Sequence, residues 1–258
     1  MKDVKSIKSV PTSLRRHALR QVAKRRLPYT VTLTDFDKAG VRFELSNIVE
    51  YFRVIEHGGE TEYLGAMLAH LRPDDVLFDV GANVGLVALH ASKICRTVAF
   101  EPDPSFKKRL EINSGLNADR SFDIEPIAIS DSDGTVDLFT DGADGNSPSL
   151  AHQRGESGSV SVSAQSLDSI MAEGRLPQPT VVKMDIEGAE ILALRGGRNL
   201  LSGPHRPRSL FIEVHNGFLP GFGSSSTEVF SLLAEYGYNT EIYRAERWGQ
   251  THLILDAS

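Results

Sequence analysis

Residues 76–85 constrain the fold of this chain more than any other feature. The stretch 76–80 is short, apolar and rich in strand-forming residues, and Gly81 and Gly85 interrupt it before apolar residues resume at helical spacing. A buried strand, a tight glycine turn and a helix start form the ligand-binding corner of an open α/β sheet. Gly81 lets a ligand approach the backbone closely because it carries no side chain. Asp79 places a carboxylate at the strand end, which suits a ligand with hydroxyl or amino groups.

The spacing of the glycines separates two kinds of nucleotide ligand. The dinucleotide fingerprint is G-x-G-x-x-G, whereas here Asn83 stands two residues after Gly81 and the next glycine is Gly85. This departure disfavours an NAD-dependent oxidoreductase, which stays an alternative. A second apolar strand ends in Glu101, and a carboxylate at that place commonly holds a ribose diol. NAD and S-adenosylmethionine both carry such a diol.

The charge of the chain is unevenly distributed. The net charge of −6 conceals a basic segment, 1–26, which holds nine of the 28 Lys and Arg residues and a single acidic one. The rest of the chain is acidic, so we expect no nucleic-acid partner. Leu14, Ala18 and Val22 recur every four residues, which predicts a basic amphipathic helix over 12–26. Such a helix fits contact with an anionic membrane, RNA or a protein partner; a solvated arm is the alternative.

Other features indicate the compartment. The single cysteine, Cys95, excludes an intramolecular disulfide and favours a reducing environment. We expect it to pack inside the helix that follows the glycine turn. No stretch approaches the roughly 18 apolar residues of a membrane span, and no secretory apolar segment is present. We therefore expect a cytoplasmic protein, with an Arg-rich transit peptide as the alternative.

Strand and helix patterns alternate along the chain, which predicts a doubly wound, mainly parallel sheet. A hairpin is expected at 29–45, ahead of the main domain. Residues 141–166 are rich in Asp, Gly, Ser and Pro and predict a long loop. The predicted domains are 1–54, a basic arm with the hairpin, and 55–258, the main α/β domain. Further strands are expected at 124–129, 136–139, 181–184, 209–214, 238–243 and 251–255, the last pair implying an antiparallel edge.

Polar residues directly follow several predicted strands. They are Asp79, Glu101, Asp185 and His215. Because the carboxyl ends of parallel strands meet along one rim, we expect these side chains to converge. Lys183 lies within an apolar strand, where a lysine needs a carboxylate partner, and Glu213 is the predicted one. Glu190 is expected to be a surface or packing carboxylate.

Taken in order, several strings of the sequence resemble one family. They are 78–85, 100–102, 127–131, 182–190 and 211–215. This order is similar to that of the FkbM family of class I S-adenosylmethionine-dependent methyltransferases. The resemblance covers roughly 55–255, and its most specific element is D-I-E-G-A-E at 185–190. It implies a seven-stranded Rossmann-like sheet and methyl transfer, usually onto a hydroxyl oxygen of a sugar, polyketide or similar small molecule.

The resemblance also implies roles for individual residues. The glycine turn would wrap the methionine part of the cofactor, Glu101 would take the ribose hydroxyls, and 127–128 would flank the adenine. Asp185 and Glu187 would lie beside the sulfonium and the acceptor. The implied cofactor-binding residues are Asp79, Gly81, Ala82, Asn83, Gly85, Glu101, Pro102, Ile127, Ala128 and Asp185.

A hydroxyl group becomes a good nucleophile only when it loses its proton, which calls for a general base. We expect His215 to be that base, with Asp185 or Glu187 orienting the acceptor or the imidazole. The less favoured alternative is a divalent cation held by Asp185, Glu213 and His215, since hard oxygen ligands suit Mg²⁺.

The acceptor itself is expected to be a small molecule or a glycan. Methyl transfer to RNA or protein is the alternative, and the acidic body of the chain disfavours it. Acceptor specificity is expected to lie in 141–166 and 216–226, the stretches that core packing constrains least.

Overall fold

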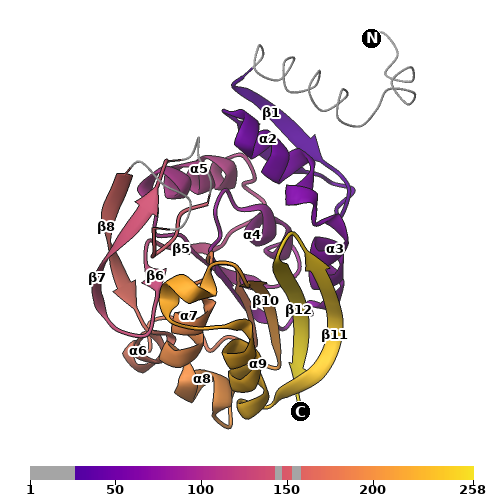
Figure 1. Ribbon diagram of the computed structural model, residues 1–258. Helices are drawn as coiled ribbons and strands as arrows, with labels where there is room; N and C mark the ends of the chain where they lie inside the picture. The colour runs from indigo at the N-terminus through magenta and orange to yellow at the C-terminus, as the bar shows by residue number, and fades with distance from the viewer. Residues whose placement is uncertain (1–26, 143–146, 153–157) are drawn as a thin grey trace.

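The centre of the molecule is a seven-stranded sheet that is parallel apart from one strand. The computed structural model describes residues 27–142, 147–152 and 158–258. Strand β12 pairs antiparallel with both of its neighbours, and the remaining pairs are parallel. In spatial order the strands are β11 (Tyr238–Arg247), β12 (Gln250–Ala257), β10 (Ser209–His215), β9 (Val181–Met184), β3 (Val76–Val80), β4 (Arg96–Phe100) and β5 (Asp123–Glu125). The predicted fold class is confirmed, including the antiparallel pairing at one edge (Figure 1).

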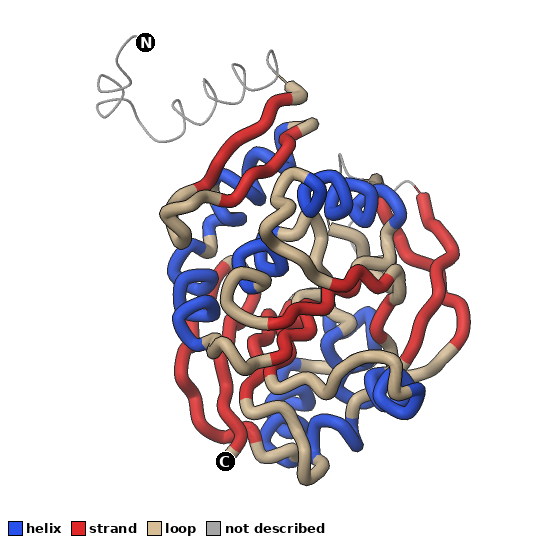
Figure 2. Tube along the Cα trace, turned by 180° about the vertical axis from the view of Figure 1, so that it is seen from behind, coloured by secondary structure: helices blue, strands red, loops and turns tan. Residues whose placement is uncertain are grey.

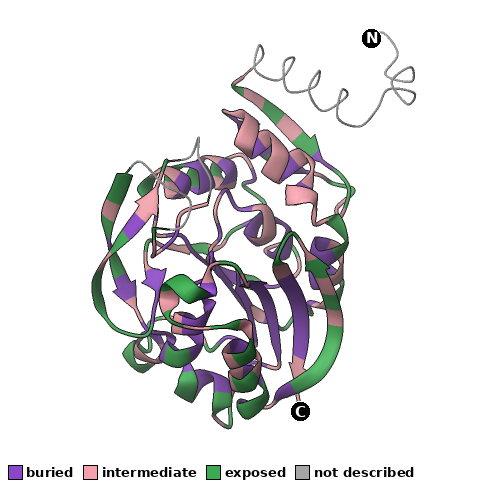
Figure 3. Ribbon diagram, viewed as in Figure 1, coloured by how far each residue is buried: buried purple, intermediate pink, exposed green. Residues whose placement is uncertain are grey.

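Helices cover both faces of the sheet (Figure 2). Successive strand residues point to opposite faces, so in β3 Phe78 packs into one apolar cluster and Leu77 into another. All seven residues of β10 are buried, as expected for a strand covered on both faces, and the central strands are buried throughout (Figure 3). The first cluster includes α6 (Leu167–Glu173), α7 (Glu190–Gly196), α8 (Arg198–Ser202) and α9 (Ser226–Glu235), and the second includes α3 (Thr61–His70) and α4 (Leu86–Ala91).

The helix starts follow the capping residues in the sequence. Helix α5 (Pro104–Gly115) begins after Asp103, whose side chain accepts hydrogen bonds from the N–H groups of Ser105 and Phe106. Ser225 caps α9 by accepting from the Glu228 N–H. The Glu228 side chain accepts from the Ser224 hydroxyl, so only half of a capping box is present.

The predicted hairpin is confirmed as β1 (Tyr29–Leu33) and β2 (Val41–Leu45), and helix α2 (Ile48–Ile55) follows it. Phe43 belongs to the same apolar cluster as Phe106 of α5. The side-chain oxygens of Asn113 and Asn117 accept from the backbone of β2 at 2.9 Å. The N-terminal part therefore shares a core with the sheet domain, and the predicted boundary at residue 54 falls inside α2. The basic segment 1–26 lies outside the described residues.

Two predictions are wrong in detail, one of a strand and one of a loop. The stretch 124–129 is divided between β5 of the main sheet and β6 (Ala128–Ile129) of a second sheet, because Pro126 lacks the N–H that a continuous strand needs. The predicted loop 141–166 contains β8 (Gly158–Gln165), which pairs with β6 and with β7 (Gly134–Thr140). In β8 small polar residues alternate with Val and Ala, a period of two that composition alone conceals.

The position of Cys95 also differs from expectation. It is buried, as predicted, but lies beyond the end of α4 at Ala91. Burial raises the pKa of its thiol to about 11, so the thiolate needed for reactivity is scarce at neutral pH. Along the described ranges, none of the helices combines the length and the apolar character that crossing a membrane requires.

Candidate active site

The glycine turn after β3 is shaped by close packing of two loops. Gly81 has φ +81°, and a Cβ there would stand 2.0 Å from the Asp185 carbonyl oxygen, in the loop after β9. Its N–H donates to the Phe100 carbonyl at 3.1 Å. Gly85, with φ +92°, meets the Leu110 side chain instead, where a Cβ would lie at 2.6 Å. Gly81 thus brings the ends of β3, β4 and β9 together, while Gly85 lets α5 pack closely.

Asp79 and Lys183 form a buried ion pair across neighbouring strands. They are register partners of β3 and β9, and Nζ lies 3.0 Å from Oδ1. Burial opposes the lysine charge, but the Asp79 charge outweighs it and raises the pKa of Lys183. The predicted partner Glu213 is therefore wrong. Nζ also donates to the Gly81 carbonyl at 2.9 Å, so the pair supports the glycine turn from behind.

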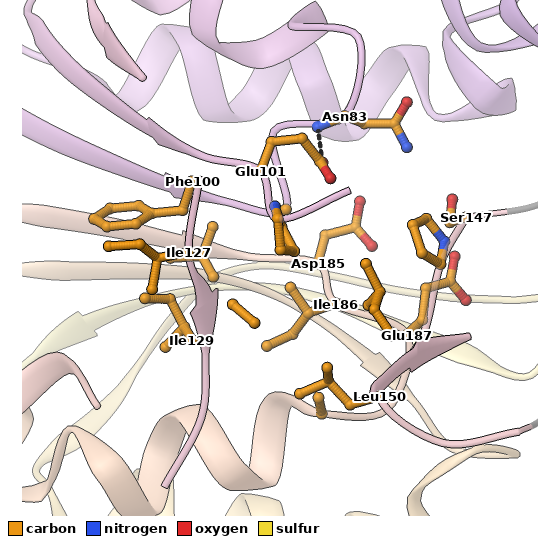
Figure 4. A pocket seen from close by; sticks show the side chains of 17 residues that line it. Asn83, Phe100, Glu101, Ile127, Ile129, Ser147, Leu150, Asp185, Ile186 and Glu187 are labelled. Atoms are coloured by element: carbon orange, nitrogen blue, oxygen red, sulfur yellow. Dashed lines mark hydrogen bonds between the residues drawn. The ribbon is translucent and has the colours of Figure 1, made fainter. Parts of the chain in front are cut away.

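Glu101 is held in one orientation at the end of β4. The Asn83 N–H donates to one carboxylate oxygen at 2.8 Å (Figure 4). The Asp103 N–H donates to the other at 2.9 Å. Burial raises the pKa of Glu101 to about 7 in spite of these hydrogen bonds. Asn83 itself has φ 54°, a conformation that asparagine tolerates better than most residues. The turn thus fixes the carboxylate that sequence analysis assigned to a ribose.

A cavity opens beside this turn, at the carboxyl ends of β3, β4 and β9. Apolar side chains gather at one end, around Phe100 and Ile127, and polar ones at the other, around Asp185 and Glu187 (Figure 4). Asp79, Ala82, Gly85 and His215 do not line it. The predicted site residues that do are Gly81, Asn83, Glu101, Pro102, Ile127, Ala128, Asp185 and Glu187. We call this the first cavity.

A second cavity adjoins the first. Its walls come from α2, the 3₁₀ helix η2 (His57–Gly59), α3 and the turn between β11 and β12, with Arg53 and Trp248 among the lining residues. Ala82 also lines it. The residues common to both cavities are Gly81, Asn83, Ser147, Asp185 and Glu187. The two carboxylates of Asp185 and Glu187 therefore stand at the junction of the cavities.

Of the two stretches expected to carry acceptor specificity, 141–166 contributes to a cavity wall and 216–226 does not. Ser147, Pro148 and Leu150, from the first stretch, line the first cavity. Residues 216–226 are all described and line neither cavity. Phe218 instead packs against Gly188, where a Cβ would lie 2.7 Å from the phenylalanine Cβ. Most of the second cavity comes from segments whose sequence carries no recognisable ligand pattern.

The loop after β9 holds Glu187 in an unusual backbone conformation. Its φ is 55°, in the left-handed region, and the Ser149 hydroxyl donates to its carbonyl at 3.1 Å. A residue other than glycine costs on the order of 1–3 kcal/mol in such a conformation, and strain of this kind clusters at functional sites. The strained turn directs the Glu187 side chain into the junction.

His215 lies behind the junction among carboxylates. Its Nδ1 is 2.9 Å from Oε1 of Glu190, and its Nε2 is 3.4–3.8 Å from oxygens of Asp185, Glu187 and Glu213. Burial opposes protonation, but Glu190 and the other carboxylates outweigh it and raise the pKa of His215 well above its usual value. His215 lines neither cavity. The surrounding carboxylates therefore favour a positive charge at this position.

Glu190 is the site residue that sequence reasoning missed. It is fully buried, and its Oε1 accepts from the N–H groups of Ile186 and Gly188 as well as contacting His215. Of the two places expected for it, the surface and the packed interior, it occupies the interior. The signal was available, because Glu190 ends the most specific string of the sequence, D-I-E-G-A-E.

A second histidine and its carboxylates lie on the far side of Glu213. The Nε2 of His252 is 3.5 Å from oxygens of both Glu60 and Glu213. Burial opposes its charge, but these two carboxylates raise the pKa of His252 to about 10. Burial and the Asp185 charge raise the pKa of Glu213 to about 7. Glu213 thus connects two clusters, one at the junction and one in the wall of the second cavity.

The sequence of this chain matches one family model and several known proteins. The family model described as "Methyltransferase FkbM domain" matches residues 79–240. The chain is 31% identical over 221 residues to the hexuronic acid methyltransferase AglP of Haloferax volcanii, covering 80% of this chain and 81% of AglP. It is 30% identical over 173 residues to the 2-O-methyltransferase NoeI of Sinorhizobium fredii, covering 58% of this chain and 69% of NoeI.

A solved structure shares the fold. The methyltransferase FkbM from Methylobacillus flagellatus KT matches with a TM-score of 0.52 at 18% identity. The match covers 75% of this chain and 47% of that one, so this chain spans about half the length of that protein. Each of these three relatives is named a methyltransferase, and none is named an oxidoreductase.

Proposed function

Because the chain belongs to the FkbM methyltransferase family, and is thus a methyltransferase as its sequence predicts, we propose that it methylates a sugar hydroxyl using S-adenosylmethionine. The observation that carries this proposal is the junction of two cavities at Asp185 and Glu187. Methyl transfer needs two ligands whose reacting atoms meet in line. Two adjoining cavities with a polar junction provide that arrangement.

The donor fits the first cavity. We assign the adenine to its apolar end, between Ile127 and Ile129, and the ribose hydroxyls to Glu101. The methionine part would then pass Gly81, with the sulfonium directed at Asp185. Asp79 lines neither cavity, so its proposed contribution to donor binding acts through Lys183 and the Gly81 carbonyl.

The acceptor fits the second cavity. Trp248 is 67% exposed at the turn between β11 and β12 and lines this cavity, and a flat indole suits the apolar face of a sugar ring. Arg53 also lines it, and its Nη1 is buried without a hydrogen-bond partner among the described residues. A guanidinium with a free donor suits a carboxylate. These two features support a uronic acid acceptor, the class named for AglP.

The chemistry proposed for the junction is an in-line displacement. The acceptor hydroxyl donates a hydrogen bond to Asp185 or Glu187, which points its oxygen at the methyl group. Asp185, whose side chain is 35% exposed, takes the proton as the O–CH₃ bond forms and the C–S bond breaks. His215 was expected to be the base; because it lines neither cavity, we propose instead that it helps to hold Asp185 and Glu187 in place.

Transfer of a labelled methyl group tests the proposal. The full chain is incubated with methyl-labelled S-adenosylmethionine and glycosides of glucuronic acid or glucose. We expect label in the uronic acid product, and a loss of about 10²–10⁴ in turnover for Asp185→Asn with S-adenosylhomocysteine binding retained. Asp119→Asn, at an exposed carboxylate, is the matched control. Label found only in RNA or protein, or full activity in Asp185→Asn, would contradict the proposal.

A further inference from the structure

His215 carries a buried ring nitrogen that makes no hydrogen bond. The residue is 2% exposed, and Nε2 has no hydrogen-bond partner among the residues that the structure describes. Its near neighbours are oxygens of Glu213 at 3.4 Å, Glu187 at 3.5 Å and Asp185 at 3.8 Å. None of these contacts has the geometry of a hydrogen bond. A buried polar atom with such neighbours calls for a physical explanation.

The other ring nitrogen is held as in a metal-binding histidine. A histidine that binds a metal commonly donates its second N–H to a carboxylate, which fixes the tautomer and the ring orientation. Here Nδ1 lies 2.9 Å from Glu190, whose same oxygen is fixed by two backbone N–H groups. With Nδ1 as donor, the lone pair of Nε2 points at Asp185 and Glu187.

From this geometry we propose that Asp185, Glu187 and His215 bind one divalent metal ion at the junction of the two cavities. One ligand atom from each residue lies within 4.8 Å of the others. Ligand atoms about 2.1 Å from an ion lie at most about 4.2 Å apart. Asp185 is the most exposed of the three, so a small movement of its side chain completes the set.

The donor set selects among metals. One imidazole with carboxylates suits Mn²⁺ or Zn²⁺ better than Mg²⁺, which prefers oxygen ligands throughout. The second cluster, Glu60, Glu213 and His252, has similar spacing. It lies beyond Glu213, and among the described residues no carboxylate contacts the other ring nitrogen of His252. The two clusters therefore make distinguishable predictions.

The purpose of the ion rests on the proposed function. A cation at the junction would bind the acceptor hydroxyl and lower its pKa. The O–H proton then passes to the free oxygen of Asp185, the alkoxide oxygen bonds the methyl carbon, and the electron pair of the C–S bond stays on sulfur. The products are the methyl ether, S-adenosylhomocysteine and one proton.

Mn²⁺ binding to the full chain tests the site without donor or acceptor. Chelator-treated protein is titrated with Mn²⁺ while electron paramagnetic resonance measures the free ion, and spin-echo modulation detects coordinated imidazole nitrogen. We expect one ion per chain with imidazole coupling. Asp185→Asn and His215→Gln should each weaken binding at least tenfold, whereas Glu60→Gln should change it less than twofold. Competition with Zn²⁺ and Mg²⁺ should displace Mn²⁺ in that order.

Three results would overturn the proposal: the absence of saturable binding, wild-type affinity in Asp185→Asn, or weakening in Glu60→Gln alone. Circular dichroism shows whether each variant folds. If His215→Gln does not fold, Asp185→Asn still decides the test, because the Asp185 side chain is partly exposed. Because no methyl donor is present, failure of methyl transfer leaves this outcome unaffected. If the metal-free protein still methylates sugars, the ion has no part in methyl transfer, and the proposed function stands without it.

Discussion

Lys183 of β9 donates to the carbonyl of Gly81 at 2.9 Å while its ammonium stays 3.0 Å from the buried Asp79 carboxylate of β3. The Lys183 side chain therefore connects β9 to the turn that shapes the first cavity. Asp79 therefore stabilises the site from behind the turn and does not line either cavity.

Breaking this ion pair should destabilise the fold. Asp79→Asn leaves a lysine charge buried without its partner, so we expect the free energy of unfolding to fall by roughly 3–5 kcal/mol, measured by urea denaturation. The double variant Asp79→Leu with Lys183→Met removes both charges and should recover much of that loss. Lys93→Met, which breaks an exposed pair with Asp119, serves as the control and should have little effect. A single Asp79→Asn variant as stable as the wild type would show that the pair contributes nothing.

Donor binding should depend on pH through Glu101. Its pKa is about 7 in the ligand-free fold, so the carboxylate that accepts the ribose hydroxyls is present above pH 7 and is lost as the pH falls below it. Calorimetry with S-adenosylhomocysteine should therefore show weaker binding at pH 6 than at pH 8. Glu101→Gln should bind more weakly and lose this dependence, while Glu111→Gln, an exposed change, should keep it. The same pH response in Glu101→Gln as in the wild type would assign the effect to another group.

Close packing at Gly81 predicts a position-specific alanine effect. In Gly81→Ala the Cβ would stand 2.0 Å from a backbone oxygen, in addition to the strain of φ +81°. Gly174→Ala has a similar φ of +68° with open space around it, so it isolates the conformational strain of about 1–2 kcal/mol. We expect Gly81→Ala to lose at least about 1–3 kcal/mol more than this control, because overpacking adds its own cost. Equal melting temperatures for the two variants would contradict the close approach.

Trp248 should act on the acceptor alone. Removing an aromatic contact of about 0.5–1.5 kcal/mol raises the acceptor KM by roughly two- to tenfold. Because the side chain is exposed, Trp248→Ala should leave the melting temperature and S-adenosylhomocysteine affinity unchanged. Ile242→Ala changes the other large exposed apolar residue among those described, 48% exposed on β11, and should leave KM unchanged. An equal rise in KM for both variants would remove Trp248 from the acceptor site.

The sequence predicted features that depend on neighbouring residues better than features that depend on residues far apart in the chain. Local signals, such as the glycine turn at Gly81 and the hairpin pattern at 29–45, gave the correct elements. The partner of Lys183 was wrong because register between distant strands decides it, and β3 pairs with β9 only in the folded sheet.

The second cavity could not be predicted for a related reason. Arg53 and Trp248 come from segments nearly 200 residues apart, and neither carries a local ligand pattern. Only the docking of α2 onto the sheet domain brings them to one wall. The sequence left open whether Glu190 lies at the surface or packs inside; two backbone N–H groups and His215 stabilise it in the interior.

A crystal structure with S-adenosylhomocysteine tests the central claim most directly. The account predicts the adenine between Ile127 and Ile129, the ribose hydroxyls on Glu101, and the sulfur directed at Asp185 and Glu187, with the second cavity left open. Density for the ligand in the cavity lined by Arg53 and Trp248, or a ribose that does not contact Glu101, would contradict it.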